Sequence, residues 1–202
     1  MAHSAESVDL VDADVVRSFA RAAVLAALMG VAAFVAIPIS AVPGTLQTLV
    51  VFLAGLFLGP IWGPVAMILY LVTGAIGAPV FSGFSAGPGV LVGPNGGFLL
   101  TFPIGALLVG ALVHRGWRLR DPAEVSRLVI ALALVVATAV IYAAGFTWYA
   151  WVTDTALVEA FTVVALPLIP GDLLKIAVAL AIVQTGRIDP TTASTASDTS
   201  NR

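Results

Sequence analysis

The sequence contains no cysteine, only one lysine and two histidines among its 202 residues. The absence of cysteine excludes a disulfide framework and any thiolate metal site. The histidines, His3 and His114, lie far apart in the chain, which excludes a histidine-rich metal cage. The single lysine, Lys175, follows a leucine and does not complete a G-x-x-x-x-G-K-[ST] phosphate loop. We therefore expect no metal, no other cofactor and no ATP hydrolysis by that route.

Charged residues are also scarce. They make up 10% of the chain, whereas 60% of its residues are hydrophobic and the mean hydropathy is +1.07. Soluble domains carry about 25% charged residues. Residues 22–113 contain no Asp, Glu, Lys, Arg or His at all. A soluble fold needs polar positions that alternate with apolar ones, so the composition predicts an integral membrane protein.

Six apolar segments are candidates for membrane-spanning helices, which need about 20 apolar residues each. They are residues 19–37, 46–58, 61–78, 98–113, 128–151 and 173–185. We therefore predict an all-α membrane protein with six transmembrane helices in one compact bundle. This transmembrane domain covers residues 19–187. It follows a cytoplasmic segment, 1–18, and precedes a polar tail, 188–202, whose low complexity predicts disorder.

Arginine indicates the orientation of the chain in the cell membrane, because basic residues gather on the cytoplasmic side. Arg17 and Arg21 lie at the start of the first predicted helix, and Arg187 follows the sixth. The loop between the fourth and fifth predicted helices holds four more arginines. Six spans with both termini in the cytoplasm place all of these residues on one side. We accordingly predict a multi-pass membrane protein that contacts membrane lipid and no nucleic acid.

The predicted outer loops contain the unusual polar residues. Thr45 and Gln47 lie in "VPGTLQT", Asn95 lies in "GPNGGF", and Asp172 and Lys175 lie in "PGDLLK". The loop that ends in "GPNGGF" is rich in glycine and proline and carries no charge. Irregular backbone at membrane depth is tolerated only where protein buries it or where it lines a cavity. The sequence therefore predicts a capped pocket on the outer face.

Asp172 and Lys175 have two interpretations. The aspartate is an N-terminal cap that meets the positive end of the helix dipole, and the lysine extends to the lipid headgroups. Alternatively, the two side chains share a helix face at a spacing of three residues and point into the pocket as an ion pair. Ionisable residues within a membrane are costly and usually functional. The second interpretation assigns a substrate N–H to the aspartate.

Other candidates remain open at this level. Thr45 and Gln47 either satisfy the backbone at a helix end or line the pocket, and Tyr70 is either an interfacial aromatic residue or a pocket hydroxyl. On the first helix, small residues four positions apart, Ala23 and Ala27 among them, allow close helix approach. That face packs either inside the fold or against another subunit.

Several stretches of the chain together resemble one known family. They are "VPGTLQTLVVFLAGLFLGPIWG", "LYLVTGAIGAPVFSG", "GPNGGFLLTFPIGALLVGAL" and "LPLIPGDLLK". They contain P-x-T-x-Q at residues 43–47, Y-L-x-x-G-x-x-G-x-P-V-F at residues 70–81 and P-G-D-x-x-K at the last helix. On these motifs the chain resembles the BioY family, the substrate-binding subunits of energy-coupling-factor biotin transporters, over nearly the whole length from the first to the sixth helix.

The resemblance implies a six-helix substrate-binding domain with a biotin pocket near the outer surface. It also implies partnership with a transmembrane coupling subunit and two ATPase subunits, which the small face at Ala23 and Ala27 would contact. The chain itself would then be no enzyme. The candidate substrate-binding residues are Thr45, Gln47, Tyr70, Phe81, Asn95, Asp172 and Lys175.

The sequence departs from the family pattern at Asn95 and Phe98, where threonine and tyrosine are more usual, and the loop before them has no basic residue. Two candidates therefore remain for the group that holds the biotin carboxylate: Lys175, and backbone N–H groups at the start of the fourth helix. Three alternatives to biotin uptake remain: transport of another vitamin, a membrane enzyme acting on lipid headgroups, and a passive channel.

Overall fold

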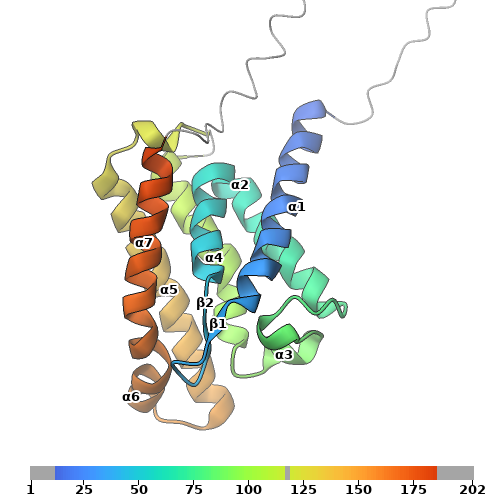
Figure 1. Ribbon diagram of the computed structural model, residues 1–202, viewed down its shortest axis with the longest axis vertical. Coiled ribbons are helices and arrows are strands. Elements are labelled where there is room, and N and C mark those ends of the chain that lie inside the picture. The colour runs from blue at the N-terminus through green and yellow to red at the C-terminus, as the bar shows by residue number, and fades with distance from the viewer. Residues whose placement is uncertain (1–11, 117–118, 186–202) are drawn as a thin grey trace, which may run out of the picture.

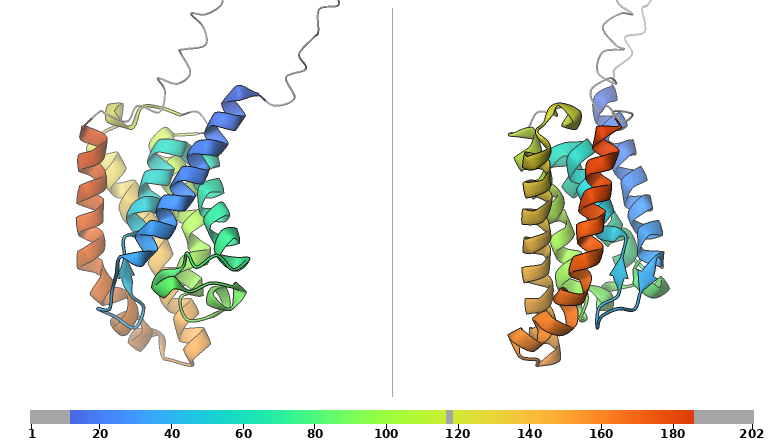
Figure 2. Two further views of the ribbon diagram at one scale, coloured as in Figure 1. Left: turned by 45° about the vertical axis from the view of Figure 1, so that its right-hand side comes forward. Right: turned by 60° about the vertical axis from the view of Figure 1, so that its left-hand side comes forward.

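The computed structural model describes residues 12–116 and 119–185 (Figure 1). Residues 1–11 of the predicted cytoplasmic segment, the predicted tail 188–202, Arg118 and Arg187 lie outside the described residues. Within the described part, five helical stretches are long and apolar enough to cross a membrane. They are α1 (Ala13–Phe34), α2 (Gln47–Ala75), α4 (Gly96–His114), α5 (Arg127–Thr153) and the stretch Leu157–Gln184. Figure 2 shows these stretches side by side as one bundle.

Helix α2 reverses its direction at Gly59. This glycine has φ 72° and ψ −168°, a backbone conformation that is essentially restricted to glycine. A Cβ on Gly63 would lie 2.9 Å from the carbonyl oxygen of Ala54, although residues nine apart in a straight helix are separated by about 13.5 Å. The chain therefore folds back into two arms, residues 47–58 and 60–75. These arms correspond to the separate helices predicted at 46–58 and 61–78.

Both predicted ends of the first helix are wrong. Helix α1 begins at Ala13 because Asp12 caps it, accepting a hydrogen bond of 3.0 Å from the backbone N–H of Asp14. It ends at Phe34 rather than at residue 37. Pro38 disfavours helical geometry in the residue before it, and the chain instead forms β1 (Ala36–Ile37). This short strand pairs antiparallel with β2 (Gly44–Thr45), so that the hairpin leads directly into α2.

The loop between α2 and α4 contains two short helices, η1 (Ser82–Phe84) and α3 (Pro88–Val92). Gly77, Gly83 and Gly87 have positive φ angles and give the loop its turns. A hydrogen bond of 2.8 Å from the Gly87 N–H to the Gly74 carbonyl ties the loop to the end of α2. In Figure 1, α3, the two strands and α6 all lie at the same end of the bundle.

The last predicted helix, 173–185, begins too late, because the residues before it are also helical. Helix α6 (Leu157–Ala160) continues as a π-helical turn, η3 (Phe161–Ala165), a 3₁₀ turn, η4 (Leu166–Leu168), and α7 (Ile169–Gln184). Pro167 and Pro170 lack the N–H that a regular α-helix requires. The helix changes its hydrogen-bonding pattern around them, which the apolar periodicity of the sequence did not indicate.

Close contacts between glycines and large side chains hold α2, α4 and α5 together. A Cβ on Gly55 would lie 2.6 Å from that of Val109, and one on Gly145 would lie 2.3 Å from the ring of Phe98. Small residues let helix backbones approach closely inside a membrane. A 3₁₀ turn, η2 (Pro122–Glu124), lies in the loop between α4 and α5. The packed helices leave a cavity at the end of the bundle that carries the strands and α3.

Candidate functional site

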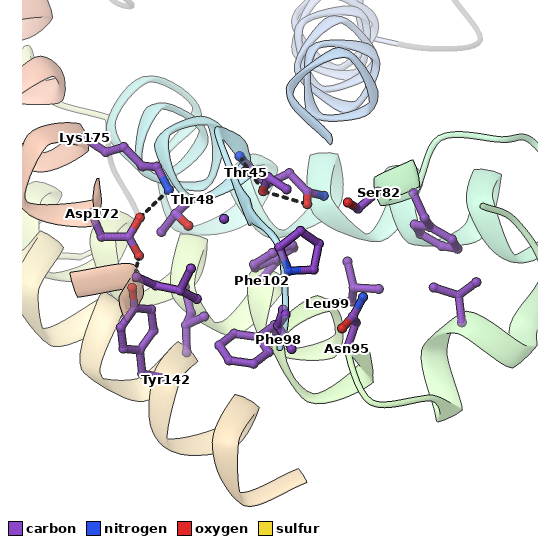
Figure 3. Close-up of a pocket in the computed structure, with 18 of the residues that line it drawn as sticks. Thr45, Thr48, Ser82, Asn95, Phe98, Leu99, Phe102, Tyr142, Asp172 and Lys175 are labelled. Atoms are coloured by element: carbon purple, nitrogen blue, oxygen red, sulfur yellow. Dashed lines mark hydrogen bonds and ion pairs between the residues drawn. The ribbon is translucent and has the colours of Figure 1, made fainter. Parts of the chain in front are cut away.

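The cavity lies where the β1–β2 hairpin, the loop before α4 and the start of α7 meet the starts of α2 and α4 and the middle of α5 (Figure 3). Its volume is about 60 Å³, enough for a few water molecules. Three aromatic rings belong to its apolar lining, those of Phe81, Phe98 and Phe102. The polar side chains in the lining are those of Thr45, Gln47, Thr48, Ser82, Ser85, Asn95, Tyr142, Asp172 and Lys175.

Asp172 and Lys175 form an ion pair in the cavity wall. The distance from Lys175 Nζ to Asp172 Oδ1 is 2.5 Å, and the side chains are 13% and 4% exposed for the lysine and aspartate respectively. The second carboxylate oxygen, Oδ2, accepts a hydrogen bond from the hydroxyl of Tyr142. Asp172 is not the N-cap of α7, which is Leu168. The structure therefore favours the ion-pair interpretation over the helix-cap interpretation.

Tyr142 is the polar partner that the sequence reasoning missed. It lies on α5, 30 residues before Asp172, and its hydroxyl is buried. One signal was present in the sequence. Interfacial tyrosines gather near the ends of membrane helices, whereas Tyr142 lies well inside the apolar run from residue 128 to 151. A tyrosine in the interior of such a helix needs a hydrogen-bond partner when it is buried.

We expect Tyr142→Phe to lower the free energy of unfolding by about 1.5–3 kcal/mol, because a carboxylate loses a charge-assisted hydrogen bond. Thermal unfolding in detergent measures this loss. Tyr149→Phe is the matched control, since Tyr149 lies on the same helix and outside the cavity lining. Equal stability of the two variants would show that the hydroxyl of Tyr142 contributes nothing to the carboxylate.

Thr45 and Gln47 form a second polar group in the lining. The Thr45 hydroxyl donates to Gln47 Oε1 at 2.9 Å and accepts from the backbone N–H of Gln47 at 3.2 Å. The amide of Gln47 also donates through Nε2 to the hydroxyl of Tyr70 at 2.7 Å. One N–H of Gln47 Nε2 and one lone pair of Oε1 are not used by these bonds. The pair thus satisfies backbone at the start of α2 and also presents polar atoms to the cavity.

Tyr70 differs from the other candidate residues because it does not line this cavity. Its side chain, only 1% exposed, instead lines a second cavity of about 450 Å³ between α1 and the second arm of α2. Ala23 and Ala27 line the same cavity. Both alanines are exposed, so this small-residue face is not packed inside the fold.

Asn95 and the aromatic residues complete the site. Asn95 precedes α4 and makes no capping hydrogen bond with its side chain, which leaves its amide available to a ligand. The rings of Phe98 and Tyr142 meet edge to face with centroids 6.2 Å apart. Phe81 is fully buried and meets Tyr70 in the same way at 5.5 Å. The structure thus brings six of the seven candidate substrate-binding residues around one cavity.

The lining combines one acid, one base, neutral amides and hydroxyls, and apolar rings. Such a site suits a compact molecule whose polar edge has both N–H donors and a carbonyl acceptor, and whose body is apolar. Within the described ranges, no three His, Asp or Glu side chains gather closely enough to hold a metal ion. The polar groups of the lining are therefore suited to binding and orienting a ligand by hydrogen bonds.

Comparisons with known proteins place the chain in one family. The model of the BioY family matches residues 2–190. A probable biotin transporter BioY from Pyrococcus horikoshii is 37% identical over 162 residues, which cover 80% of this chain and 91% of the relative. The biotin transporter BioY from Thermotoga maritima is 36% identical over 171 residues, covering 82% and 93%.

A crystal structure of the S-component for biotin from an ECF-type ABC transporter has the same fold. Its TM-score is 0.78 at 24% sequence identity, and the superposition covers 88% of this chain and 94% of the other. The family match extends over nearly the whole chain, and the two relatives align over most of their own length. The chain belongs to the BioY family.

Proposed function

We propose that this protein binds biotin in the cavity beside α7 and serves as the membrane subunit for biotin uptake. The observation that carries the proposal is the buried Asp172–Lys175 pair, which faces a cavity lined by amides and aromatic rings. Biotin presents two ureido N–H groups and one carbonyl, with an apolar bicyclic body. Asp172 accepts a ureido N–H, while Gln47 or Asn95 donates to the carbonyl.

The remainder of the lining suits the remainder of the ligand. Phe98 and Phe102 provide apolar surface for the bicyclic ring system. The carboxylate of biotin is assigned to Lys175 or to backbone N–H groups at the start of α4. The loop before α4 and the β1–β2 hairpin form part of the cavity wall, and in this proposal they move outward when biotin enters.

We place the cavity on the outer side of the membrane and count six spans, with each arm of α2 as one. The start of α1 and the end of α7 lie at one end of the bundle, opposite α3, α6 and the strands (Figure 1). Arg17 and Arg21, near the start of α1, and Arg115 and Arg120, in the described part of the loop between α4 and α5, fall at the first end. Since basic residues gather on the cytoplasmic side, both termini are cytoplasmic in this arrangement.

Energy for uptake comes from partner subunits in this proposal. A structural relative is the S-component of an ECF-type ABC transporter, and we extend that assembly to this chain as a transmembrane coupling subunit and two ATPase subunits. The exposed face of α1 with Ala23 and Ala27 supports the proposal, because small residues allow another helix to approach closely. The chain itself is a transporter subunit and not an enzyme.

Biotin titration of the purified protein in detergent tests the proposal. Trp148 donates to the Gly93 carbonyl at 3.0 Å, so tryptophan fluorescence reports movement of the loop before α4. We expect a saturable change with biotin and none with thiamine or riboflavin. Folded protein that does not bind biotin would overturn the proposal. Saturable binding of another vitamin would assign a different substrate, and biotin flux in liposomes without partner subunits would indicate a channel.

A further inference from the structure

A single wall separates the biotin cavity from the cavity beside α1. Gln47 and Phe81 line the first cavity, whereas Tyr70 and Val80 line the second. The wall is therefore one side chain thick where the second arm of α2 meets the first residues of the following loop. A displacement on one side of this wall reaches the other side directly.

The consecutive residues Val80 and Phe81 belong to the wall, and their side chains face opposite cavities. Phe81 packs on Gly74, where a Cβ would lie 2.2 Å from the end of its ring. Val80 instead lies against α1, because a Cβ on Gly30 would approach it to 3.3 Å. The two residues are consecutive in the chain, so a displacement of the Phe81 backbone carries Val80 with it. A ligand that displaces Phe81 therefore also moves Val80 against α1.

A series of hydrogen bonds also crosses the wall, and the donor and acceptor of each bond can be assigned. The carbonyl of Val80 only accepts, so the Tyr70 hydroxyl, 3.3 Å away, donates to it. The Tyr70 oxygen must then accept from Gln47 Nε2, which leaves Gln47 Oε1 to accept from Thr45. The hydroxyl protons of Tyr70 and Thr45 are both committed, and one of the two N–H groups of Gln47 Nε2 is held by Tyr70. A ligand that turns the Gln47 amide breaks the bond to Tyr70.

We infer that Tyr70 is a positioning residue that transmits occupancy of the biotin cavity to the face of α1 that carries Ala23 and Ala27. The inference rests on the proposed biotin binding. It assigns Tyr70 a role different from substrate contact, because the side chain lines the α1 cavity and reaches the ligand only through Gln47 and Phe81. Biotin contacts Gln47 and Phe81 only when the cavity is occupied, and these contacts favour one position of the wall over another. Energetic coupling between two sites requires such a difference.

The absence of cysteine makes a direct test possible. Ala27→Cys introduces the only thiol of the chain at the exposed α1 face, and the rate of maleimide labelling in detergent is measured with and without saturating biotin. We expect biotin to change this rate about fivefold, the lower end of the usual range for coupled sites. Leu132→Cys on α5, where the leucine is 55% exposed, is the control and should label equally in both states.

Tyr70→Phe in the Ala27→Cys background keeps the ring and removes the hydroxyl. We expect biotin still to bind to this variant while the labelling rate no longer responds to it. Val80→Ala, outside the biotin-cavity lining, provides a second variant if Tyr70→Phe does not fold, and its response should fall likewise. A purely structural role for Tyr70 would lower stability and leave the response intact.

The outcomes separate this inference from the proposed function. Absence of biotin binding in the protein with only Ala27→Cys, and in the unsubstituted chain, overturns both. Biotin binding without a change in labelling overturns the inference alone. A change in labelling that persists in both Tyr70→Phe and Val80→Ala shows that the signal bypasses the wall, and this result also overturns the inference.

Discussion

Asp172→Asn and Lys175→Met should each abolish measurable biotin binding and lower the free energy of unfolding by about 3–5 kcal/mol. The loss of stability follows because either change leaves the other charge buried without its partner. The pair is almost fully enclosed, with the lysine 13% and the aspartate 4% exposed. The loss of binding follows from the proposed contacts, in which Asp172 supplies the acceptor for a ureido N–H and Lys175 orients that carboxylate through their ion pair.

The double variant Asp172→Asn/Lys175→Met separates these two effects. Removing both charges leaves no unpaired ion, and replacing a buried pair by neutral residues of similar volume is often neutral for stability. We expect the thermal unfolding temperature to recover towards that of the unsubstituted protein, while biotin titration still shows no binding. Wild-type affinity in the double variant would mean that the pair supports only the fold.

The ion pair between Arg17 and Asp14 provides the control for this experiment. It has the same spacing of three residues on a helix, but its side chains are 45% and 73% exposed. Exposed pairs contribute roughly 0–1 kcal/mol. Asp14→Asn should therefore change stability by less than about 1 kcal/mol and leave biotin affinity unchanged.

Gly97→Ala should weaken biotin binding and reduce stability by about 1–3 kcal/mol, the usual cost of overpacking. A Cβ at this position would lie 2.3 Å from that of Trp148 and 2.7 Å from the backbone oxygen of Ala144. The backbone of α5 cannot rotate away as a flexible side chain can, so α4 and α5 separate. This separation moves Asn95 and Phe98 on the α4 side away from Tyr142 on α5.

Gly171→Ala is the matched control for Gly97→Ala. Gly171 is also helical and adjoins the site, but nothing lies within 4 Å of a Cβ built on it. Alanine is a better helix former than glycine by about 1 kcal/mol, so the control should be neutral or more stable. Unfolding temperature and biotin titration check both variants. A Gly97→Ala protein as stable as the control would contradict the close approach of α4 and α5.

The sequence by itself determined the class of the protein and most of the pocket. The uncharged run of residues 22–113 requires a membrane, because water cannot solvate such a surface. The spacing of Asp172 and Lys175 already predicted a shared helix face. Polar residues at Thr45, Gln47 and Asn95 were detectable since they interrupt apolar runs where polar groups are costly.

Only the tertiary structure decided which residues meet across the bundle. The pairing of Tyr142 with Asp172 spans 30 residues and two helices, and local periodicity carries no information about such contacts. The same holds for the position of Tyr70 between two cavities, which its bond to Gln47, 23 residues away, fixes. Helix boundaries around Pro38, Pro167 and Pro170 also depended on nearby packing and backbone hydrogen bonds. Sequence patterns indicate whether a residue is buried. Which residue it then contacts depends on how the helices pack in the folded protein.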